Sequence, residues 1–260
     1  MKKVAILGCG NLGSSIVEGL IDSNFCKPSH ITATKRNPAT LSKYSELGVT
    51  VISDNKKATI DSDIIILAVK PFQAIDVLNE IKTEVDGKIL ISVVTGLELK
   101  KITTVVNNSG FIFRAMPNTA IAIKESMTCI SSFSASSKEL NYVIELFNVL
   151  GQVTVIDEKL MDAATVLGAC GIAYAMRYIR ANIQGGIEIG FDAKTAGLIA
   201  EQTVKGAAQL LLQKGLHPEQ EIDKVTTPKG CTIAGLNEME HQGFSSSLIK
   251  GICASFGKIT

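Results

Sequence analysis

Gly8, Gly10 and Gly13 near the start of the chain have the spacing GxGxxG, which can hold a dinucleotide when a strand precedes it and a helix follows. The apolar run Val4–Leu7 leads directly into the first glycine, and apolar residues at helical spacing follow the last one. In this context the first glycine allows a tight turn, the second lets the backbone approach a pyrophosphate, and the third lets the helix pack closely. The free N–H groups of the helix would face the phosphates. A flexible turn in an ordinary βαβ unit is the alternative.

The residues after the second predicted strand (30–33) bear on which dinucleotide would bind. In folds of this kind an acidic residue about 20 positions beyond the glycines binds the ribose of NAD, whereas basic groups accept the 2′-phosphate of NADP. Thr34, Lys35 and Arg36 stand here, with no acid among them. A guanidinium binds phosphate bidentately and stacks on adenine. We therefore expect NADPH, with NADH as the second choice, although a solvated basic turn would look the same.

Three further segments could carry chemistry. Residues 68–71 end the most hydrophobic predicted strand, and the proline there fixes the start of a helix. Residues 114–119 form a polar loop after another predicted strand. Residues 226–236 place hydroxyls and a glycine before a predicted helix, whose N-terminal N–H groups can hold a carboxylate. Ordinary capping by threonine is the alternative for the last segment.

The catalytic groups absent from the sequence also narrow the reaction. We find no GxSxG motif, no Cys/His pairing with a recognisable spacing and no paired carboxylates at strand ends. Hydride transfer asks less of the protein, because the nicotinamide carries the chemistry. A dehydrogenase that acts on an alcohol generally needs a general base such as His or Lys, and none is obvious here beyond Lys70. A polarised C=N bond needs only a hydrogen-bonding hydroxyl. The residues present favour an imine.

Composition excludes several classes of function. The chain has 260 residues, of which 46% are hydrophobic and 20% charged, enough for one large domain or two ordinary ones. A net charge of +1 without a basic, aromatic stripe argues against nucleic acid. With no apolar run of about 18 residues and no signal pattern, we expect a cytoplasmic protein without a membrane partner. Six cysteines without a CxxC pair predict free thiols, and three scattered histidines predict no metal site.

The pattern of apolar residues divides the chain into two predicted domains. Residues 1–157 alternate helix-length segments with short β runs, expected at 4–7, 30–33, 49–52, 63–69, 88–92, 111–114 and 152–156. This alternation predicts an α/β fold, a Rossmann-type doubly wound parallel sheet that binds NADP. Residues 158–260 read as an all-helical substrate and dimerisation domain, with a connector between Pro218 and Pro228. A self-contained helical bundle is the alternative to a dimer.

Taken together, these segments resemble the pyrroline-5-carboxylate reductase family, which catalyses the last step of proline biosynthesis. The resemblance spans nearly the whole chain in order. It comprises the GxGNxG loop at 8–13, Leu-Ala-Val-Lys-Pro at 67–71 with Gln73, Arg-Ala-Met-Pro-Asn-Thr at 114–119 and Thr-Pro-Lys-Gly-Cys-Thr-Ile-Ala-Gly-Leu at 227–236. The last segment is the specific one, since many unrelated enzymes share Rossmann loops. The resemblance implies NADPH-dependent reduction of the imine 1-pyrroline-5-carboxylate to L-proline.

The resemblance also implies roles for individual residues. Thr232 would be the catalytic residue, with its hydroxyl on the ring nitrogen, and Thr227, Gly230 and Cys231 would help it hold the substrate carboxylate. The implied cofactor site comprises Gly8, Gly10, Asn11, Leu12, Gly13, Thr34, Lys35, Arg36, Asn55, Ala68, Val69, Lys70, Pro71, Thr95 and Gly96. Family members are usually dimers with interlocked helical domains, often assembled into rings, which implies a homodimer and allows a ring of dimers.

Three departures from the family pattern concern the substrate more than the fold. Where the family usually reads Ser-Gly-Ser-Gly-Pro-Ala-Tyr, residues 168–174 read Gly-Ala-Cys-Gly-Ile-Ala-Tyr. Ala120 replaces a proline, and Lys229 replaces a glycine, where it could add a charge for the carboxylate or obstruct it. The alternatives are a reductase of another imine, a β-hydroxy-acid reductase with Lys194 or Lys205 as the catalytic lysine, or a non-catalytic NADPH-binding paralogue.

Overall fold

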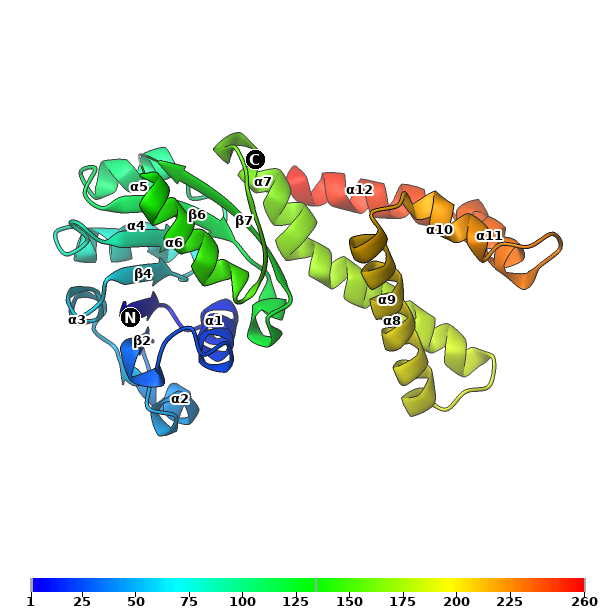
Figure 1. Cartoon of the computed structure of the whole chain (residues 1–260), viewed down its shortest axis with the longest axis horizontal. Helices are drawn as coiled ribbons and strands as arrows, with labels where there is room; N and C mark the ends of the chain where they lie inside the picture. Colours follow the sequence, from blue (N-terminus) through cyan, green and yellow to red (C-terminus); the bar gives the residue numbers. More distant parts are fainter. Residues whose placement is uncertain (1, 134, 260) are drawn as a thin grey trace. The chain divides into compact units, whose positions relative to one another are not determined.

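The computed structural model describes residues 2–133 and 135–259, which divide into two compact units (Figure 1). The first unit comprises residues 1–170 with 256–260, and the second comprises residues 171–255. By contacts the division therefore falls between Cys170 and Gly171. The domain boundary expected from the sequence, between residues 157 and 158, stays a prediction.

An eight-stranded sheet, as counted over the described residues, forms the centre of the first unit. Its spatial order is β3-β2-β1-β4-β5-β6-β7-β8. The strands are β1 Val4–Leu7, β2 Ile31–Thr34, β3 Thr50–Ile52, β4 Ile64–Leu67, β5 Ile89–Ser92, β6 Phe111–Met116, β7 Ser126–Phe133 and β8 Gly151–Val155. Neighbouring strands run parallel except β6 and β7. The chain order reverses between β1 and β4, which is where α/β sheets bind ligands.

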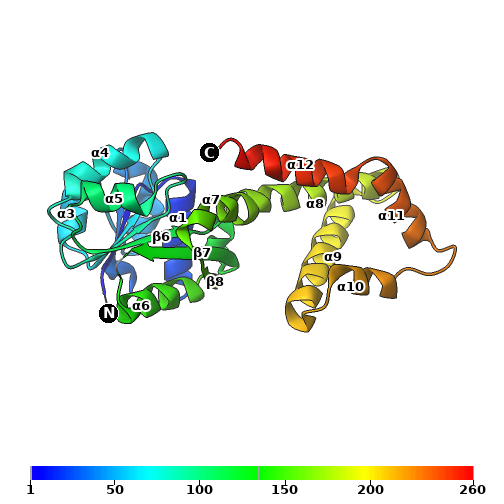
Figure 2. The ribbon, with the colours of Figure 1, turned by 90° about the horizontal axis from the view of Figure 1, so that it is seen from above.

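Helices cover both faces of this sheet, and each face has a hydrophobic cluster of its own. In Figure 2, α3, α4 and α5 lie on one face and α6 on the other. The helices of this unit are α1 Asn11–Asp22, α2 Ser42–Glu46, α3 Asn55–Ile60, α4 Pro71–Ile81, α5 Leu99–Val105, α6 Ser137–Asn148 and α7 Met161–Ala164. Ile6 and Ile66 belong to one hydrophobic cluster, and Ala5 and Ile65 to the other. Successive side chains of a strand point to opposite faces, so these continuous apolar runs are buried on both sides.

The Rossmann-type fold predicted from the sequence is confirmed, with one addition. The expected β runs correspond to β1 to β6 and β8, but β7 was not expected. Its sequence, Ser-Met-Thr-Cys-Ile-Ser-Ser-Phe, contains four hydroxyl residues and lacks the Ile/Val run of the parallel strands. It pairs antiparallel to β6 and extends the sheet with β8 beyond the parallel part.

The regular secondary structure of the second unit is entirely helical in its described residues, with turns between the helices. It contains α8 Gly171–Glu188, α9 Ala193–Lys214, α10 Pro218–Lys224, α11 Cys231–His241 and most of α12 Phe244–Phe256. The expected connector between Pro218 and Pro228 contains α10, because Pro218 occupies the first turn of a helix rather than ending one. His217 caps that helix, and Gln220 completes a capping box with it.

Large apolar side chains remain exposed on this helical unit. None of the residues of α8, α11 and α12 that the structure describes is buried. Ile189 is 79% exposed, Leu198 70% and Leu212 75%. In the described parts of the chain, every helix is too short or too polar to cross a membrane.

Candidate functional site

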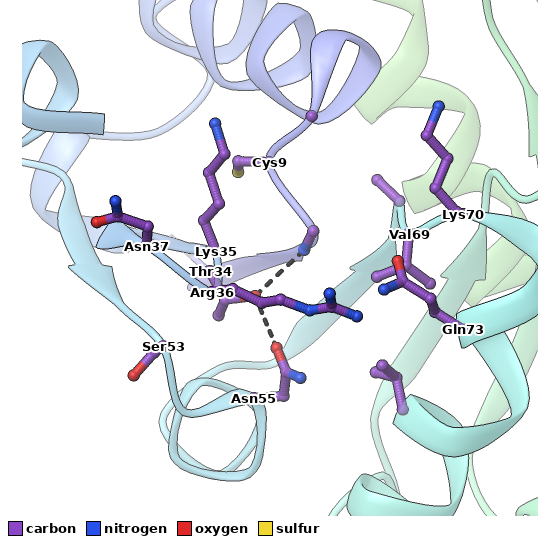
Figure 3. Close-up of a pocket in the computed structure, with 14 residues that line it drawn as sticks. Cys9, Thr34, Lys35, Arg36, Asn37, Ser53, Asn55, Val69, Lys70 and Gln73 are labelled. Carbon is purple, nitrogen blue, oxygen red and sulfur yellow. Dashed lines mark hydrogen bonds between the residues drawn. The ribbon is translucent and has the colours of Figure 1, made fainter. Parts of the chain in front are cut away.

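A cleft of about 380 Å³ lies at the carboxyl ends of β1, β2, β3 and β4 (Figure 3). Its lining comes from the loops that follow these strands and from α4. The lining residues are Gly8, Cys9, Gly10, Thr34, Lys35, Arg36, Asn37, Ser53, Asn55, Ala68, Val69, Lys70, Gln73 and Val77. The cleft therefore sits where the strand order reverses, as the fold predicts for a nucleotide site.

The three glycines of the first loop meet the three demands of a pyrophosphate turn. Gly8 has a φ of +96°, and a Cβ there would lie 2.6 Å from Val69 Cγ1. A Cβ on Gly13 would lie 2.5 Å from the Gly8 carbonyl oxygen, so α1 packs directly on the turn. A Cβ on Gly10 would meet no protein atom within 4 Å among the described residues. Open space in front of Gly10 is what a phosphate approaching the backbone requires.

The N-terminus of α1 faces this open space with its donors available. Gly10 is the N-cap residue, and no side chain of the described residues caps the helix. The first N–H groups of an α-helix have no partner inside the helix and attract anions. The first three residues of α1 are Asn11, Leu12 and Gly13. These three residues do not line the cleft. The loop and the helix end together fit the pyrophosphate of a dinucleotide.

The Thr34 side chain joins the glycine loop to the start of α3. The Gly8 N–H donates to Thr34 Oγ1 at 3.2 Å, and the Thr34 hydroxyl donates to Asn55 Oδ1 at 2.7 Å (Figure 3). Thr34 is 1% exposed. The Thr34 hydroxyl therefore connects two walls of the cleft, and its single proton is engaged in the hydrogen bond to Asn55.

Two cations line the same part of the cleft. In the view of Figure 3, Arg36 extends across the cleft toward Gln73, while Lys35 points another way. Neither side chain takes part in an ion pair between described residues. Both are free to meet an anionic ligand, and the guanidinium has the geometry for a bidentate contact with phosphate.

Cys9, inside the glycine loop, is not a reactive group of the site. Its thiol donates to the Ile6 carbonyl at 3.8 Å. Burial raises the pKa of the Cys9 thiol to about 12, so it stays protonated at neutral pH. The cleft thus offers hydrogen-bond donors and cations but no thiolate nucleophile from this residue.

The remaining predicted cofactor residues occupy different places. Ala68, Val69 and Lys70 line the cleft, whereas Pro71, which begins α4, does not. Thr95 and Gly96 lie in the turn after β5 and do not line this cleft. Their contact with a cofactor stays a prediction, as do all the individual binding roles.

Five lining residues were not among the predicted site residues: Cys9, Asn37, Ser53, Gln73 and Val77. Gln73 had been noticed only as part of the family pattern. Gln73 and Val77 are four residues apart and share one face of α4. The proline at the helix start was the sequence signal that could have placed both residues on a helix beside residues 68–70. Ser53 follows β3, and nothing in its local sequence marks it.

The predicted substrate residues come together at the N-terminus of α11 in the second unit. The Gly230 N–H donates to the Thr227 carbonyl at 2.9 Å, and Gly230 is the N-cap residue. A Cβ on Gly230 would lie 2.5 Å from Thr227 Oγ1, so a side chain there would force the Thr227 hydroxyl to move. Cys231 and the half-buried Thr232 are the first two residues of the helix, which no described side chain caps.

The backbone conformation of Lys229 accounts for the glycine that the pyrroline-5-carboxylate reductase pattern usually has at this position. The φ of Lys229 is +59°, in the left-handed region. This conformation costs a residue with a Cβ about 1 kcal/mol and costs glycine almost nothing. The chain keeps the backbone shape of the turn with a lysine, and places an exposed ammonium group beside the helix N-terminus.

Arg114, where the sequence predicted the start of a polar loop, lies inside β6, which continues to Met116, and it has a structural role. It is 2% exposed, and its guanidinium lies 3.1 Å from Glu158 and 3.4 Å from Asp162. Further along the loop, Asn118 Nδ2 donates to the Gly168 carbonyl at 3.2 Å, inside the π-helix Thr165–Cys170. These contacts tie the end of β6 to the segment that precedes α8.

Known proteins match both parts of the chain. Residues 158–260 match the family model described as pyrroline-5-carboxylate reductase dimerisation, and residues 3–96 match the model described as NADP oxidoreductase coenzyme F420-dependent. The protein named pyrroline-5-carboxylate reductase 2 of Dictyostelium discoideum is 43% identical over 277 residues, covering 99% of this chain and 92% of that protein. The chain belongs to the pyrroline-5-carboxylate reductase family. The resemblance found in the sequence is therefore confirmed.

Other members of the pyrroline-5-carboxylate reductase family agree with this assignment. Pyrroline-5-carboxylate reductase 1 of Dictyostelium discoideum is 47% identical over 268 residues, which cover 98% of this chain. The chain spans 49% of the length of that relative. A crystal structure of Plasmodium falciparum pyrroline carboxylate reductase with NADP bound has a TM-score of 0.92 at 28% identity. The match covers 99% of this chain and 97% of that one.

Proposed function

We propose that the chain catalyses the NADPH-dependent reduction of 1-pyrroline-5-carboxylate to L-proline, as an oxidoreductase that acts on a CH–NH bond. The observation that carries the proposal is the identity of 43% along 92% of a protein named for this activity. The cleft supports it independently, because Lys35 and Arg36 stand where an NAD-specific site would have an acid.

The cofactor is NADPH, and the residues of the cleft fit its parts. The turn at Gly8 and Gly10 and the N-terminus of α1 hold the pyrophosphate. Arg36 and Lys35 bind the 2′-phosphate, which NADH lacks, so NADH binds more weakly. The edge formed by residues 68–71 completes the site. When bound, NADPH supplies a hydride to the imine carbon of the substrate.

The N-terminus of α11 supplies the groups for the substrate. The free N–H groups of Cys231 and Thr232, with the turn at Thr227 and Gly230, bind the substrate carboxylate. The Thr232 hydroxyl hydrogen-bonds the ring nitrogen and orients the C=N bond. The ring nitrogen takes a proton from solvent, and the positive charge of the iminium makes the carbon of the C=N bond more electrophilic. Addition of a hydride to that carbon gives a neutral secondary amine, which then takes up a second proton from solvent.

A homodimer accounts for the apolar surface of the helical unit. Helices α8, α9 and α12 expose large apolar side chains, and contiguous apolar patches on a protein surface mark interaction sites. The family model over residues 158–260 is described as a dimerisation domain. The dimer buries these helices against a second copy, and further assembly into a ring of dimers is part of the proposal.

The cysteines support a reducing compartment such as the cytoplasm. Cys9, Cys26, Cys129, Cys170, Cys231 and Cys253 are all free thiols in the structure. Disulfides are rare in the cytoplasm, where thioredoxin and glutathione keep thiols reduced.

A direct assay tests the proposed function. The purified protein is mixed with NADPH and 1-pyrroline-5-carboxylate, and the loss of absorbance at the NADPH band is followed. The proposal expects substrate-dependent oxidation of NADPH with formation of proline. Binding of NADPH without turnover would support a non-catalytic paralogue, and turnover only with another cyclic imine would reassign the substrate.

A further inference from the structure

Glu80 lies beside the cleft without lining it. It sits on α4, three residues after Val77 and seven after Gln73, so the three side chains share one face of the helix. Its Oε2 atom accepts a hydrogen bond from Asn55 Nδ2 at 3.0 Å. Asn55 lines the cleft from the start of α3, so Glu80 contacts the site through this one residue.

The hydrogen-bond chain leaves one orientation for the Asn55 amide. A backbone N–H can only donate, so Thr34 Oγ1 accepts from Gly8, and with Asn55 Oδ1 facing it the Thr34 hydroxyl donates to that oxygen. A carboxylate can only accept, so the amide nitrogen of Asn55 must face Glu80. Figure 3 shows the first two of these bonds converging on Thr34.

We propose that Glu80 is a positioning residue for NADPH selectivity, acting through the Asn55 amide. The amide nitrogen carries two N–H groups, of which Glu80 binds one and the other is available to a cofactor oxygen in the cleft. A 2′-phosphate consists of acceptors and needs that donor, whereas the ribose hydroxyl of NADH can donate or accept. This inference rests on the proposed function, because it assumes a bound NADPH.

Loss of Glu80 makes two amide orientations nearly equivalent. Rotated by half a turn, Asn55 would direct its nitrogen to Thr34 Oγ1, which can accept, and its carbonyl oxygen to the place that the nitrogen occupies now. The carbonyl would repel a phosphate oxygen but could accept from a ribose hydroxyl. Removing Glu80 should therefore weaken NADPH binding more than NADH binding.

The test measures binding of each cofactor directly, by fluorescence titration without substrate. We expect Glu80→Ala to raise the Kd of NADPH about 3- to 10-fold, as for one well-placed hydrogen bond, and that of NADH less than about twofold. Glu80→Gln has a donor as well as an acceptor, no longer fixes the Asn55 amide and should also lower selectivity. In an Asn55→Ala background, Glu80→Ala should have no further effect. Asp76→Ala is the control, since Asp76 is an exposed acid on the same helix.

Each other outcome overturns the inference. Unchanged binding in Glu80→Ala, an equal loss for both cofactors, or a further loss in the Asn55→Ala background would show that Glu80 does not act on selectivity through Asn55. This inference alone is contradicted if the wild-type protein binds NADPH and turns over substrate while Glu80→Ala leaves the Kd of both cofactors unchanged. A wild-type protein that binds no NADPH contradicts the proposed function as well.

Discussion

Arg114 Nη1 lies 3.1 Å from Glu158 Oε1, and the same carboxylate oxygen accepts from the Leu99 N–H at 2.5 Å. One carboxylate therefore binds the end of β6 and the first turn of α5, across 44 and 59 residues of sequence. The turn that contains Thr95 and Gly96 directly precedes α5. Glu158 thus links β6 to the start of α5, the helix that follows this turn.

This relationship predicts a large loss of stability in Glu158→Ala. Arg114 is 2% exposed and would keep only Asp162 as a charged partner among the described residues. Breaking a buried pair costs about 3 kcal/mol or more, and the partial exposure of Glu158 reduces this to about 2 kcal/mol. Urea denaturation measures the change. Lys159→Ala removes the neighbouring surface pair with Asp157 and should cost less than about 0.5 kcal/mol. Equal effects of the two variants would contradict the role of Glu158.

Arg36 should determine the preference for NADPH. Arg36→Ala lacks the guanidinium that makes a charge-assisted contact with the 2′-phosphate. The kcat/KM with NADPH should therefore fall about 10- to 100-fold. The value with NADH should change little, because NADH has no phosphate at that position. Steady-state kinetics with both cofactors checks this, and Lys82→Ala, an exposed cation at the end of α4, is the control. A parallel fall with both cofactors would mean that Arg36 does not recognise the phosphate.

Alanine at the first two glycines of the loop should separate folding from binding. Gly8→Ala forces a Cβ within 2.6 Å of Val69 in a left-handed backbone, so we expect it to destabilise the first unit. A methyl group at Gly10 meets open space in the protein, so Gly10→Ala should fold as the wild type does. The same methyl would occupy the path of the pyrophosphate, and the Kd of NADPH should rise at least about tenfold. Thermal melting and cofactor titration together measure both effects; normal NADPH affinity in Gly10→Ala would place the pyrophosphate elsewhere.

Thr232→Ala should lower kcat about 10- to 100-fold if the hydroxyl acts on the ring nitrogen mainly in the transition state. Thr232→Ser keeps the hydroxyl and should recover most of the rate. The Kd of NADPH, measured without substrate, should be the same in both variants, which distinguishes a catalytic effect from a misfolded site. An unchanged kcat in Thr232→Ala would remove this role.

Local patterns predicted the parts of the fold that depend on local physics. The glycine loop was visible because a positive φ and close backbone approaches require glycine, and the parallel strands because burial on both faces requires continuous apolar runs. Strand β7 could not be predicted in this way, because its four hydroxyl residues interrupt any such run. Helix α10 lies within the connector expected between Pro218 and Pro228, because proline is favoured in the first turn of a helix.

Contacts between distant segments could not be read from the sequence. Ser53 follows β3 and Val77 lies on α4, and only the fold brings these two separate segments to the same cleft. Arg114 looked like a loop residue available for chemistry, but its partners lie 44 and 48 residues further along the chain. Glu80 belongs to no motif, and a hydrogen bond to Asn55 links it to the site.

Transfer of an isotope label tests the central claim most directly. The protein is incubated with NADPH that carries deuterium at the transferable position of the nicotinamide, together with unlabelled 1-pyrroline-5-carboxylate, and the product is analysed by mass spectrometry. The account predicts L-proline with a single deuterium on the former imine carbon. Proline without deuterium, or no proline despite bound NADPH, would contradict it.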